Sequence, residues 1–447
     1  MAQAPRTTLD VSALLDHGSW SSYPRAITLL AALAVIFDGF DIQILGFAIP
    51  SILREWNLTR GDFAPVLAIG LAGMTLGSVL AGYCGDRFGR RVTLIACVLL
   101  FGGATIATAV CRNLTELTIL RFLTGMGAGG ALPNVGALAA EFAPLRRRPV
   151  AVTLTMICVP LGGMGGGLLA ARILPTFGWR TLYAVGGGAP VLFALILWWT
   201  LPESPRFLAR HPRRWPDLTR LLRRMGHAVE DGTAFEDRVE QRAESQTALK
   251  IILGREHLRD TAGLWIAFFA CMHGIYLVFG WLPAMLSAQG MGLAASSSGL
   301  AAYNFGGVFG ILLWAAAATF FGSRAPLLAA ALAAAGSAFA IQFAPLRSAE
   351  SQPLLIAGFG LHGLFVNALQ TTMYVLAAHV YPTKTRASGV AFAAAVGRVG
   401  AMVSSFTGAA IIQSGGSNYL RVLAISMFCA FLGLLLVSTH FPGHRRQ

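Results

Sequence analysis

The most constraining feature of this 447-residue chain is a pair of carboxylates inside its first long apolar stretch. Asp38 and Asp41 lie near the middle of residues 25–46, which are otherwise suited to lipid. An acid at the centre of a membrane helix costs roughly 2.5–3.5 kcal/mol on insertion scales, and it is tolerated where the side chain faces a polar cavity. Because the two acids are three residues apart, they share one helical face. The pair therefore predicts proton or cation handling.

Long apolar stretches recur along the whole chain. Charged residues make up 12% of the sequence, against about 25% in a soluble domain, and the mean hydropathy is +0.64. Runs of about 18 apolar residues can cross a bilayer as helices, whereas barrel strands would alternate in character. We expect an all-α membrane protein with about twelve transmembrane helices, at 25–46, 62–83, 92–111, 116–139, 150–171, 181–201, 261–285, 297–320, 325–344, 353–378, 388–412 and 420–440.

The basic residues are distributed unevenly between the two ends of these helices. If both termini lie inside, 25 of the 34 Lys and Arg residues fall on inside segments, seven on outside loops, and two, Arg121 and Arg398, within helices. An excess of Lys and Arg on cytoplasmic segments is the usual topology signal of membrane proteins. The net charge of +14 therefore indicates cytoplasmic termini, and it does not indicate a nucleic-acid partner.

The chain divides into two halves around its one long polar stretch. Residues 138–144 and 376–382 both begin Leu-Ala-Ala and end at Pro, with a constant offset of 238. Parallel repeats of this kind pack around an axis along the membrane normal and hold substrate near the midplane. We expect a cytoplasmic N-terminal arm at 1–24, a six-helix bundle at 25–201, a solvated cytoplasmic linker at 202–260, a second six-helix bundle at 261–440 and a cytoplasmic tail at 441–447. Within the linker, the spacing of Leu218, Leu221, Leu222 and Met225 predicts a short amphipathic helix.

The cysteines and the polar segments argue against other classes of membrane protein. The six cysteines form no Cys-x-x-Cys pair, and cysteine in an apolar helix behaves as a small hydrophobic residue. We expect no disulfide, no metal site and no cofactor. A membrane enzyme would need a cluster of nucleophile and base or of metal ligands, and a receptor would usually carry a sizeable soluble domain. The sequence shows neither, so we expect no enzymatic activity.

A dense charge motif follows the second apolar run. Residues 82–91 read Gly-x3-Asp-Arg-x-Gly-Arg-Arg. Glycines let two helix ends approach closely, and the acid and the arginines can pair at the inner surface in one conformation and separate in another. We expect this loop and the ends of the repeated segments to act as gates, through Gly82, Asp86, Arg87, Gly89, Arg90, Arg91, Glu141, Arg148, His379 and Arg386.

These motifs resemble those of a known family. The chain resembles a twelve-helix transporter of the major facilitator superfamily. Residues 82–91 are similar to that family's signature between helices two and three, residues 202–206 to the segment that closes helix six, and residues 121–128 to its helix-four motif. In that motif, the resemblance implies, the arginine (here Arg121) is tied to substrate or proton movement.

Within the superfamily, the chain resembles the aromatic acid:proton symporters, carriers of 4-hydroxybenzoate, protocatechuate and related compounds. The resemblance implies a multi-pass transporter of the bacterial inner (plasma) membrane that imports an aromatic carboxylate with protons by alternating access and works as a monomer. Its partners would be the aromatic acid, protons and the lipid bilayer. The motifs that carry it are Asp38-Gly39-Phe40-Asp41, Gly130-Ala131-Leu132-Pro133-Asn134, Trp281-Leu282-Pro283, Tyr381-Pro382-Thr383 with Arg386 and Gly389, and Gly397-Arg398-Val399-Gly400-Ala401.

The sequence departs from the family pattern at two places in its second half. The second copy of the loop motif should carry an acid near 322–326, and this stretch has none. Such carriers commonly end helix ten with Glu, where this chain has His379. Both changes fall on the expected C-terminal gate.

Charge balance explains why a proton would accompany the substrate. An aromatic acid is an anion at neutral pH, and moving one charge against the membrane potential costs about 2.3 kcal/mol per 100 mV. A co-transported proton cancels that charge. The pKa of a proton-binding acid must be held near neutrality, either by burial or by a neighbour of like charge. We therefore expect Asp38 and Asp41 to bind the coupling proton as a pair.

Two arginines within helices are candidates to hold the substrate carboxylate. A guanidinium matches a carboxylate bidentately. Arg121 could also serve only to neutralise Asp38 or Asp41, and Arg398 has the same ambiguity. His273 and His362 could relay protons or simply be hydrogen-bonded. The full set of candidate substrate residues, each of which could instead serve helix packing, is Arg121, Arg398, Phe40, Gln43, Asn134, Tyr276, Trp281, Asn304, Asn367, Gln370 and Tyr374.

A second interpretation keeps the fold and changes the cargo. The chain could carry another organic anion or a sugar, or export a drug or metabolite in exchange for protons. A neutral substrate would need no arginine to bind a carboxylate. Transport of such a substrate would therefore tolerate a neutral residue in place of Arg121 or Arg398.

Overall fold

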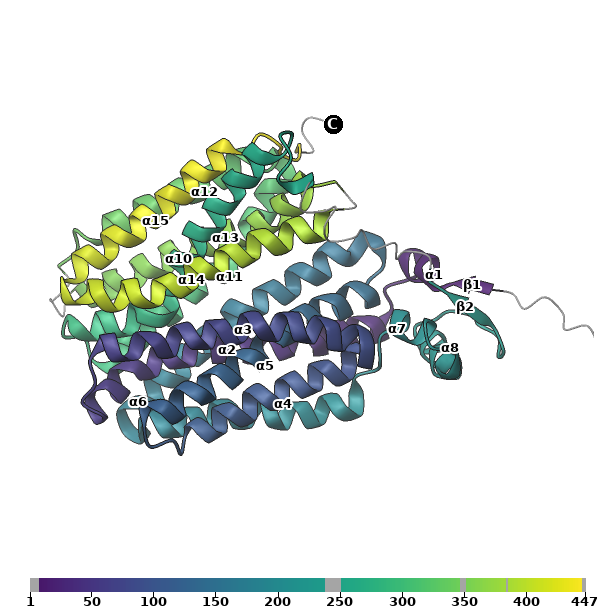
Figure 1. Cartoon of the computed structure of the whole chain (residues 1–447), viewed down its shortest axis with the longest axis horizontal. Coiled ribbons are helices and arrows are strands. Elements are labelled where there is room, and N and C mark those ends of the chain that lie inside the picture. Colours follow the sequence, from purple (N-terminus) through teal and green to yellow (C-terminus); the bar gives the residue numbers. More distant parts are fainter. Residues whose placement is uncertain (1–7, 238–250, 346–350, 383–384, 444–447) are drawn as a thin grey trace, which may run out of the picture.

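The protein is a bundle of long helices, seen in a computed structural model that describes residues 8–237, 251–345, 351–382 and 385–443 (Figure 1). We call α2 to α6 the first half and α10 to α15 the second half. The helices of each half pack mainly against one another, and the halves meet through α2 with α10, α3 with α14 and α6 with α11. The long helices are α2 (Ser22–Glu55), α3 (Arg60–Phe88), α4 (Arg90–Thr108), α5 (Leu114–Phe142), α6 (Arg148–Thr200), α10 (Leu258–Ala288), α11 (Leu293–Phe321), α12 (Arg324–Ile341), α13 (Gln352–Val380), α14 (Arg386–Gln413) and α15 (Gly416–Leu436).

Ten helical stretches in the described part of the chain are long and apolar enough to cross a membrane. One of them, Leu145–Thr200, includes α6 and holds two predicted runs, 150–171 and 181–201. α6 bends between these runs at Gly178, where φ is +76°, a conformation that glycine adopts without strain. α5 is not among the ten; its many glycines contribute little hydropathy.

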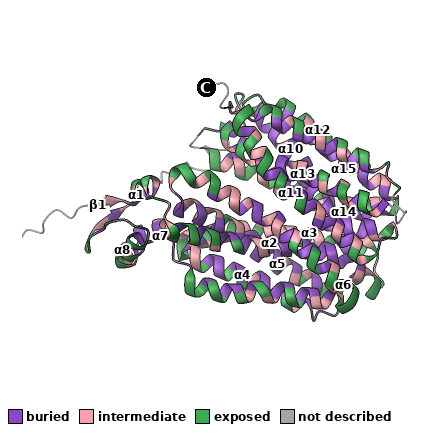
Figure 2. Cartoon of the chain, turned by 180° about the vertical axis from the view of Figure 1, so that it is seen from behind, coloured by how far each residue is buried: buried purple, intermediate pink, exposed green. Residues whose placement is uncertain are grey.

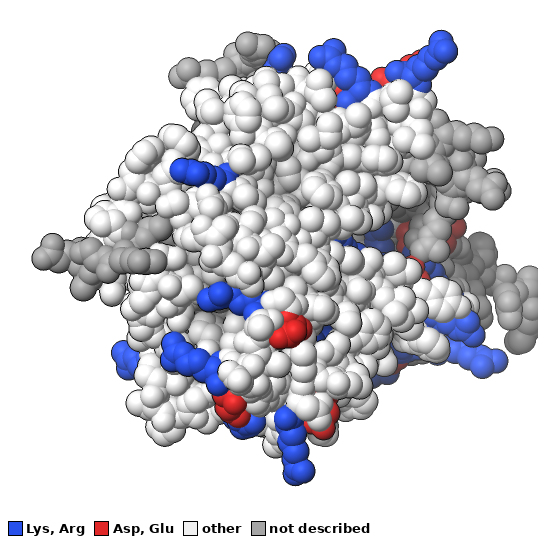
Figure 3. All heavy atoms as spheres, turned by 60° about the vertical axis from the view of Figure 1, so that its left-hand side comes forward, with Lys and Arg blue, Asp and Glu red and all other residues white. Residues whose placement is uncertain are grey.

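The outer surface of the helices is apolar. Trp199 is 85% exposed, Val110 74% and Phe177 70%. Buried residues follow the inward faces of the helices (Figure 2), and wide uncharged areas separate the charged side chains on the face shown in Figure 3. Large exposed apolar surfaces mark contact with another apolar phase, so this exterior suits lipid.

Within each half, glycines bring one pair of helices into direct backbone contact, and the two pairs are equivalent. A β-carbon on Gly77 of α3 or Gly125 of α5 would collide with the backbone of the other helix. The same holds for Gly310 of α11 and Gly363 of α13 in the second half. Gly125 and Gly363 are separated by 238 positions, the offset of the sequence repeat. The repeat therefore corresponds to the same helix contact made twice, with small residues at the crossing.

The N-terminal arm and the start of the linker fold together into a small unit at one end of the molecule (Figure 1). Strand β1 (Thr8–Asp10) pairs in parallel with β2 (Ala234–Glu236). The predicted amphipathic helix is α8 (Trp215–Arg224), and its residues Leu218, Leu221 and Leu222 are buried. Residues 202–237 are therefore partly folded, because these leucines share a core with Val11 and Leu15 of the arm. Short helices α1 (Val11–His17), η1 (Leu145–Arg147), α7 (Pro205–Ala209) and η2 (Pro212–Arg214) surround it.

The last predicted run, 420–440, ends earlier in the structure than in the sequence analysis. α15 ends at Leu436, and the chain then turns back onto the second half. The Asp260 carboxylate accepts hydrogen bonds from the backbone N–H groups of Ser438 at 2.7 Å and Thr439 at 3.2 Å. The backbone N–H of Phe441 donates to Ser323 Oγ at 3.1 Å. These contacts hold the tail out of helical conformation.

Candidate substrate and proton site

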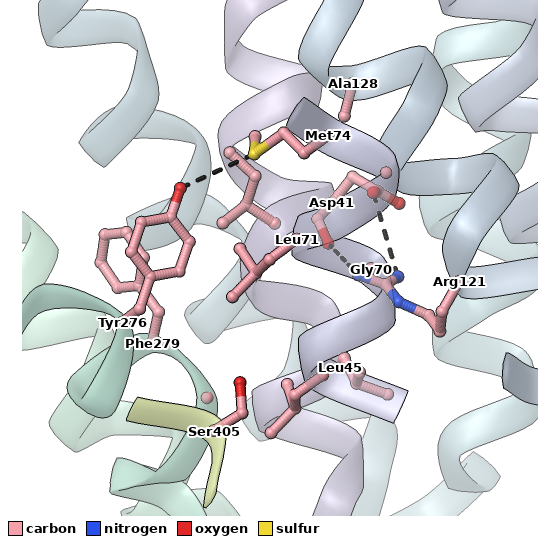
Figure 4. A pocket seen from close by; sticks show the side chains of 14 residues that line it. Asp41, Leu45, Gly70, Leu71, Met74, Arg121, Ala128, Tyr276, Phe279 and Ser405 are labelled. Carbon is pink, nitrogen blue, oxygen red and sulfur yellow. Dashed lines mark hydrogen bonds and ion pairs between the residues drawn. The ribbon is translucent and has the colours of Figure 1, made fainter. Parts of the chain in front are cut away.

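A small cavity lies where α2, α3 and α5 of the first half meet α10 and α14 of the second half (Figure 4). Its volume is about 50 Å³, enough for a few water molecules at roughly 10–15 Å³ each. Asp41 and Arg121 supply its charged wall, and Tyr276 and Ser405 face them from the second half. The rest of the lining is apolar or small: Ile42, Leu45, Leu67, Gly70, Leu71, Met74, Gly125, Ala128, Phe279 and Gly280.

Asp41 and Arg121 form a buried ion pair across two helices of the first half. Arg121 Nη1 lies 3.9 Å from Asp41 Oδ2, and Arg121 Nη2 donates to the Asp41 backbone carbonyl at 3.5 Å. Thr105 Oγ1 donates to Asp41 Oδ1 at 2.6 Å. Arg121 Nε and Nη1 have no hydrogen-bond acceptor within the described residues. The guanidinium therefore has donors to spare for another anion.

Asp38 shares the interior of the first half but has a different environment. It is 0% exposed, and neither of its carboxyl oxygens has a hydrogen-bond partner in the part of the chain that the structure describes. An unpaired ionised carboxylate buried in this way is costly. The structure thus separates the two predicted acids into one that is paired with a cation and one that is alone.

Two predicted substrate residues instead bind each other across the halves. Gln43 Nε2 of α2 donates to Asn304 Oδ1 of α11 at 3.1 Å, and Asn304 Nδ2 donates back to Gln43 Oε1 at 2.6 Å. Both side chains are 0% exposed. A β-carbon on Gly163 of α6 would collide with this pair. The reciprocal pair is therefore a tightly packed contact between the halves.

The remaining predicted substrate residues are spread through the protein. Tyr276 lines the cavity, and its hydroxyl donates to Met74 Sδ at 3.7 Å. Arg398 of α14 does not line it; its Nη1 donates to Ser78 Oγ of α3 at 2.7 Å. The other six are used in packing or in hydrogen bonds within one half: Phe40 against Gly166 and Gly186, Asn134 to Gly130, Trp281 to Ser405, Asn367 to Gly363, Gln370 to Met272, and Tyr374 against Phe268.

Several residues of the predicted first-half gate form one network of ion pairs and hydrogen bonds. Arg90 Nε lies 2.9 Å from Glu141 Oε1, and Arg90 Nη2 lies 3.4 Å from Asp86 Oδ1. Ser204 Oγ donates to the other Glu141 oxygen, and the Arg91 backbone N–H donates to Glu203 Oε1 at 3.0 Å. Residues 82–91, predicted as a loop, are helical except for Gly89, where α3 ends and α4 begins. The network joins this junction to the end of α5 and to the segment after α6.

The other members of that predicted gate have separate contacts. Gly89, with φ of +103°, packs so closely on Glu203 that a β-carbon would collide with it, whereas Gly82 faces open space. The positive φ and the contact with the Glu203 side chain therefore explain Gly89, and close helix approach explains neither glycine. Arg87 donates to the Tyr83 hydroxyl at 2.8 Å, and Arg148 pairs with Asp16 of the arm.

The predicted second-half gate is built without ion pairs in the described part of the chain. His379 is exposed and lies edge-on to Phe441 of the tail, with ring centroids 5.8 Å apart. Arg386 is also exposed. Ser323, in the loop where the sequence lacks an acid, binds the tail through Phe441 and through His440 Nδ1 at 3.0 Å. Burial lowers the pKa of His440.

Neither predicted relay histidine reaches the cavity. His273 Nδ1 lies 2.9 Å from Ser426 Oγ, and His362 Nδ1 lies 3.0 Å from Ser337 Oγ. Both bonds join helices within the second half, so these side chains have a structural use. Among the described residues, no group of three or more His, Cys, Asp or Glu is placed to hold a metal ion.

The sequence analysis did not identify several residues of the site. Thr105, which binds Asp41, is one of many threonines in apolar helices. Met74 and Ser405 line the cavity from helices of opposite halves. A polar residue in the middle of an apolar run was the available signal for Thr105 and Ser405. No sequence signal marks Met74, because methionine is common in helix cores.

A comparison with known families identifies the fold class. A family model described as Major Facilitator Superfamily matches residues 31–303 and 264–447. The chain therefore belongs to the major facilitator superfamily, whose members are transporters, and the resemblance seen in its motifs is confirmed. A solved D-xylose–proton symporter has the same fold, with a TM-score of 0.71 at 21% identity over 95% of this chain and 100% of that one.

Two curated relatives match nearly the whole chain. It is 34% identical over 428 residues to the 4-hydroxybenzoate transporter PcaK of Acinetobacter baylyi, covering 94% of this chain and 92% of that protein. It is 32% identical over 442 residues to the gallate transporter of Pseudomonas putida, covering 98% and 96%.

Proposed function

We propose that the protein imports an aromatic carboxylate together with a proton by alternating access. The observation that carries this proposal is the Asp41–Arg121 pair on the wall of a cavity between the halves, with guanidinium donors left over among the described residues. A guanidinium binds a carboxylate in a bidentate manner. Arg121 is therefore suited to exchange Asp41 for an anionic substrate. The names of both relatives, which are carriers of aromatic carboxylates, support this substrate class.

The proposed topology has twelve transmembrane helices and cytoplasmic termini in a bacterial inner membrane. α6 supplies two spans around Gly178, and α5 supplies one in spite of its low hydropathy. The positive-inside distribution of Lys and Arg supports the orientation. The proposed units are the arm at 1–24, bundles at 25–201 and 261–440, the linker at 202–260 and the tail at 441–447. Each monomer holds a complete cavity.

The two acids have different proposed roles in proton coupling. Asp41 pairs with Arg121 when no substrate is bound and releases it when the substrate carboxylate occupies Arg121, while the hydrogen bond from Thr105 to Asp41 remains. Asp38 has no hydrogen-bond partner within the described residues, and a carboxyl in such a place is stable when it carries a proton. We assign the coupling proton to Asp38. One proton cancels the charge of one substrate, which removes the cost of about 2.3 kcal/mol per 100 mV.

Alternating access requires contacts between the halves that break in each cycle. The Gln43–Asn304 pair and the Arg398–Ser78 bond both join the halves. The cavity of about 50 Å³ is too small for an aromatic ring and its carboxylate, so substrate entry requires the halves to separate there. Release of Arg398 from Ser78 would provide a second cation for the substrate. The network of Arg90, Glu141 and Asp86 belongs to the proposed cytoplasmic gate.

Uptake of labelled 4-hydroxybenzoate into proteoliposomes tests this function. We expect accumulation by the wild type with an inward proton gradient and little without one. Asp41→Asn should abolish accumulation, while Asp62→Asn, a matched change at an exposed helix cap, should keep it. Absence of uptake by correctly inserted wild type would reject this substrate. A panel of other organic anions and sugars, and an assay of outward exchange, would then identify the cargo.

A further inference from the structure

A second cavity lies where the small unit joins the first half. Its volume is about 810 Å³, within the range of about 300–1,000 Å³ that is common for small-molecule sites. It is formed by the end of α1, the start of α2 and the η1 turn between α5 and α6. The lining residues are Asp16, His17, Gly18, Trp20, Arg25, Pro144, Arg146 and Arg147. No step of the proposed transport cycle uses this cavity.

The cavity carries uncompensated positive charge. Arg25, Arg146 and Arg147 are exposed, and none of them forms an ion pair with an acid in the described part of the chain. Asp16 is the acid in the lining, and it is already paired with Arg148. Among the described residues, three guanidinium groups therefore face a shared space and none of them is paired with an acid. Guanidinium groups bind phosphate oxygens bidentately and strongly.

The position of the cavity favours a lipid over a soluble anion. Arg25 lies in the first turn of α2, and Arg147 directly precedes α6, so both stand at the ends of long apolar helices. Trp20 packs against Ala139, Ala143 and Ala151 at the same end, and the Arg25 guanidinium lies 5.8 Å from the centre of its ring. Tryptophan and clustered basic residues are both typical of the headgroup level of a membrane.

We propose that this cavity binds the phosphate-bearing headgroup of an anionic phospholipid in the inner leaflet. The assignment rests on the proposed orientation, with this end cytoplasmic, and not on the identity of the transported substrate. The bound headgroup neutralises Arg25, Arg146 and Arg147 and ties the N-terminal arm to the turn between α5 and α6.

Lipid binding by the purified full-length protein tests the proposal. The protein is stripped of lipid in a neutral detergent and titrated with phosphatidylglycerol or phosphatidylcholine, and bound lipid is counted by native mass spectrometry. We expect phosphatidylglycerol to bind the wild type in preference to phosphatidylcholine. Replacing both Arg146 and Arg147 with Ala should weaken phosphatidylglycerol binding by roughly 30-fold. Arg25→Ala, a single change on another helix, should weaken it by a smaller factor.

The control is a double variant, Arg213→Ala with Arg224→Ala, which removes two exposed arginines of the small unit that lie outside the cavity. It should bind phosphatidylglycerol like the wild type. Equal losses in both double variants, or no loss in either, would overturn the proposal. Competition by millimolar inorganic phosphate would also overturn it and would assign the cavity to a soluble anion. Substrate uptake, measured on the same preparations, reports separately on the transport function.

Discussion

The two halves of the molecule share their helix contacts but not their charges. The helices α2 to α6 contain seven acids, whereas the chain from the start of α10 onward contains two, Asp260 and Glu350. The ion pairs within the described residues all lie in the first half, the arm and the start of the linker. Equivalent glycine contacts hold α3 to α5 and α11 to α13. The repeated scaffold therefore needs only small residues at its crossings, and the proposed proton chemistry is concentrated in one half.

The largest expected effect comes from removing the buried cation of the first half. Arg121→Gln should lower the free energy of unfolding by about 3–5 kcal/mol, because it leaves the Asp41 carboxylate buried without its partner. It should also abolish active uptake. Adding Asp41→Asn to this variant should restore most of the stability and none of the transport. Unfolding in detergent, followed by circular dichroism, measures the stability. Equal stability of the single and double variants would show that Asp41 and Arg121 are not an energetic pair.

The charged gate of the first half should contribute more to stability than the uncharged gate of the second half. Glu141→Gln weakens a charge-assisted contact with Arg90 and should cost about 1.5–3 kcal/mol. His379→Gln, at the equivalent position of the repeat, removes an exposed side chain and should change stability by less than about 0.5 kcal/mol. The same unfolding assay compares them. Similar losses in both variants would contradict a charged gate in the first half alone.

A smaller effect is expected at the amide pair between the halves. The Gln43→Ala and Asn304→Ala variants and their combination form a double-mutant cycle. Polar contacts between membrane helices are worth about 0.6 kcal/mol on average, up to about 1.7, and we expect a coupling energy within that range. A coupling energy of zero would mean that the two amides do not hold the halves together, despite hydrogen bonds of 2.6 and 3.1 Å.

A similarly small stability effect should occur at Arg398, the arginine within a second-half helix. Its partner is a neutral hydroxyl on a first-half helix, Ser78, so Arg398→Gln should cost about 0.6 kcal/mol, the average for polar contacts between membrane helices. Its effect on transport separates the two interpretations of this residue. A rise of roughly tenfold in KM for 4-hydroxybenzoate would assign Arg398 to the substrate carboxylate. An unchanged KM would leave Arg121 as the cation that recognises the substrate.

Much of the fold could be predicted from the sequence because membrane helices are defined locally. Each helix needs only a long apolar run, and the repeat between residues 138–144 and 376–382 already indicated two related halves. The short unit made by β1, β2 and α8 was missed because it pairs residues over 200 positions apart, for example Leu9 with Phe235. No local pattern specifies such a pairing.

The site could also be predicted only in part, because most of its contacts join residues that are far apart in the sequence. Asp41 and Arg121 stood out because charges within apolar runs are costly and rare, and one of the two roles considered for Arg121 was pairing with this acid. The pairing of Gln43 with Asn304 was not predicted, because an amide in a membrane helix has many available partners. The cavity lining consists mostly of apolar and small residues, which look the same in sequence wherever a helix packs.

The most direct test of the account separates active uptake from exchange in an Asp38→Asn variant. In the first assay, proteoliposomes are given an inward proton gradient and accumulation of labelled 4-hydroxybenzoate is measured. In the second assay, separate proteoliposomes are preloaded with unlabelled 4-hydroxybenzoate, and its exchange with labelled substrate outside is measured. If Asp38 carries the coupling proton, the variant should lose gradient-driven accumulation while exchange continues, because the neutral amide mimics the protonated acid. Gradient-driven accumulation at the wild-type level would contradict the central claim that proton coupling depends on this first-half acid.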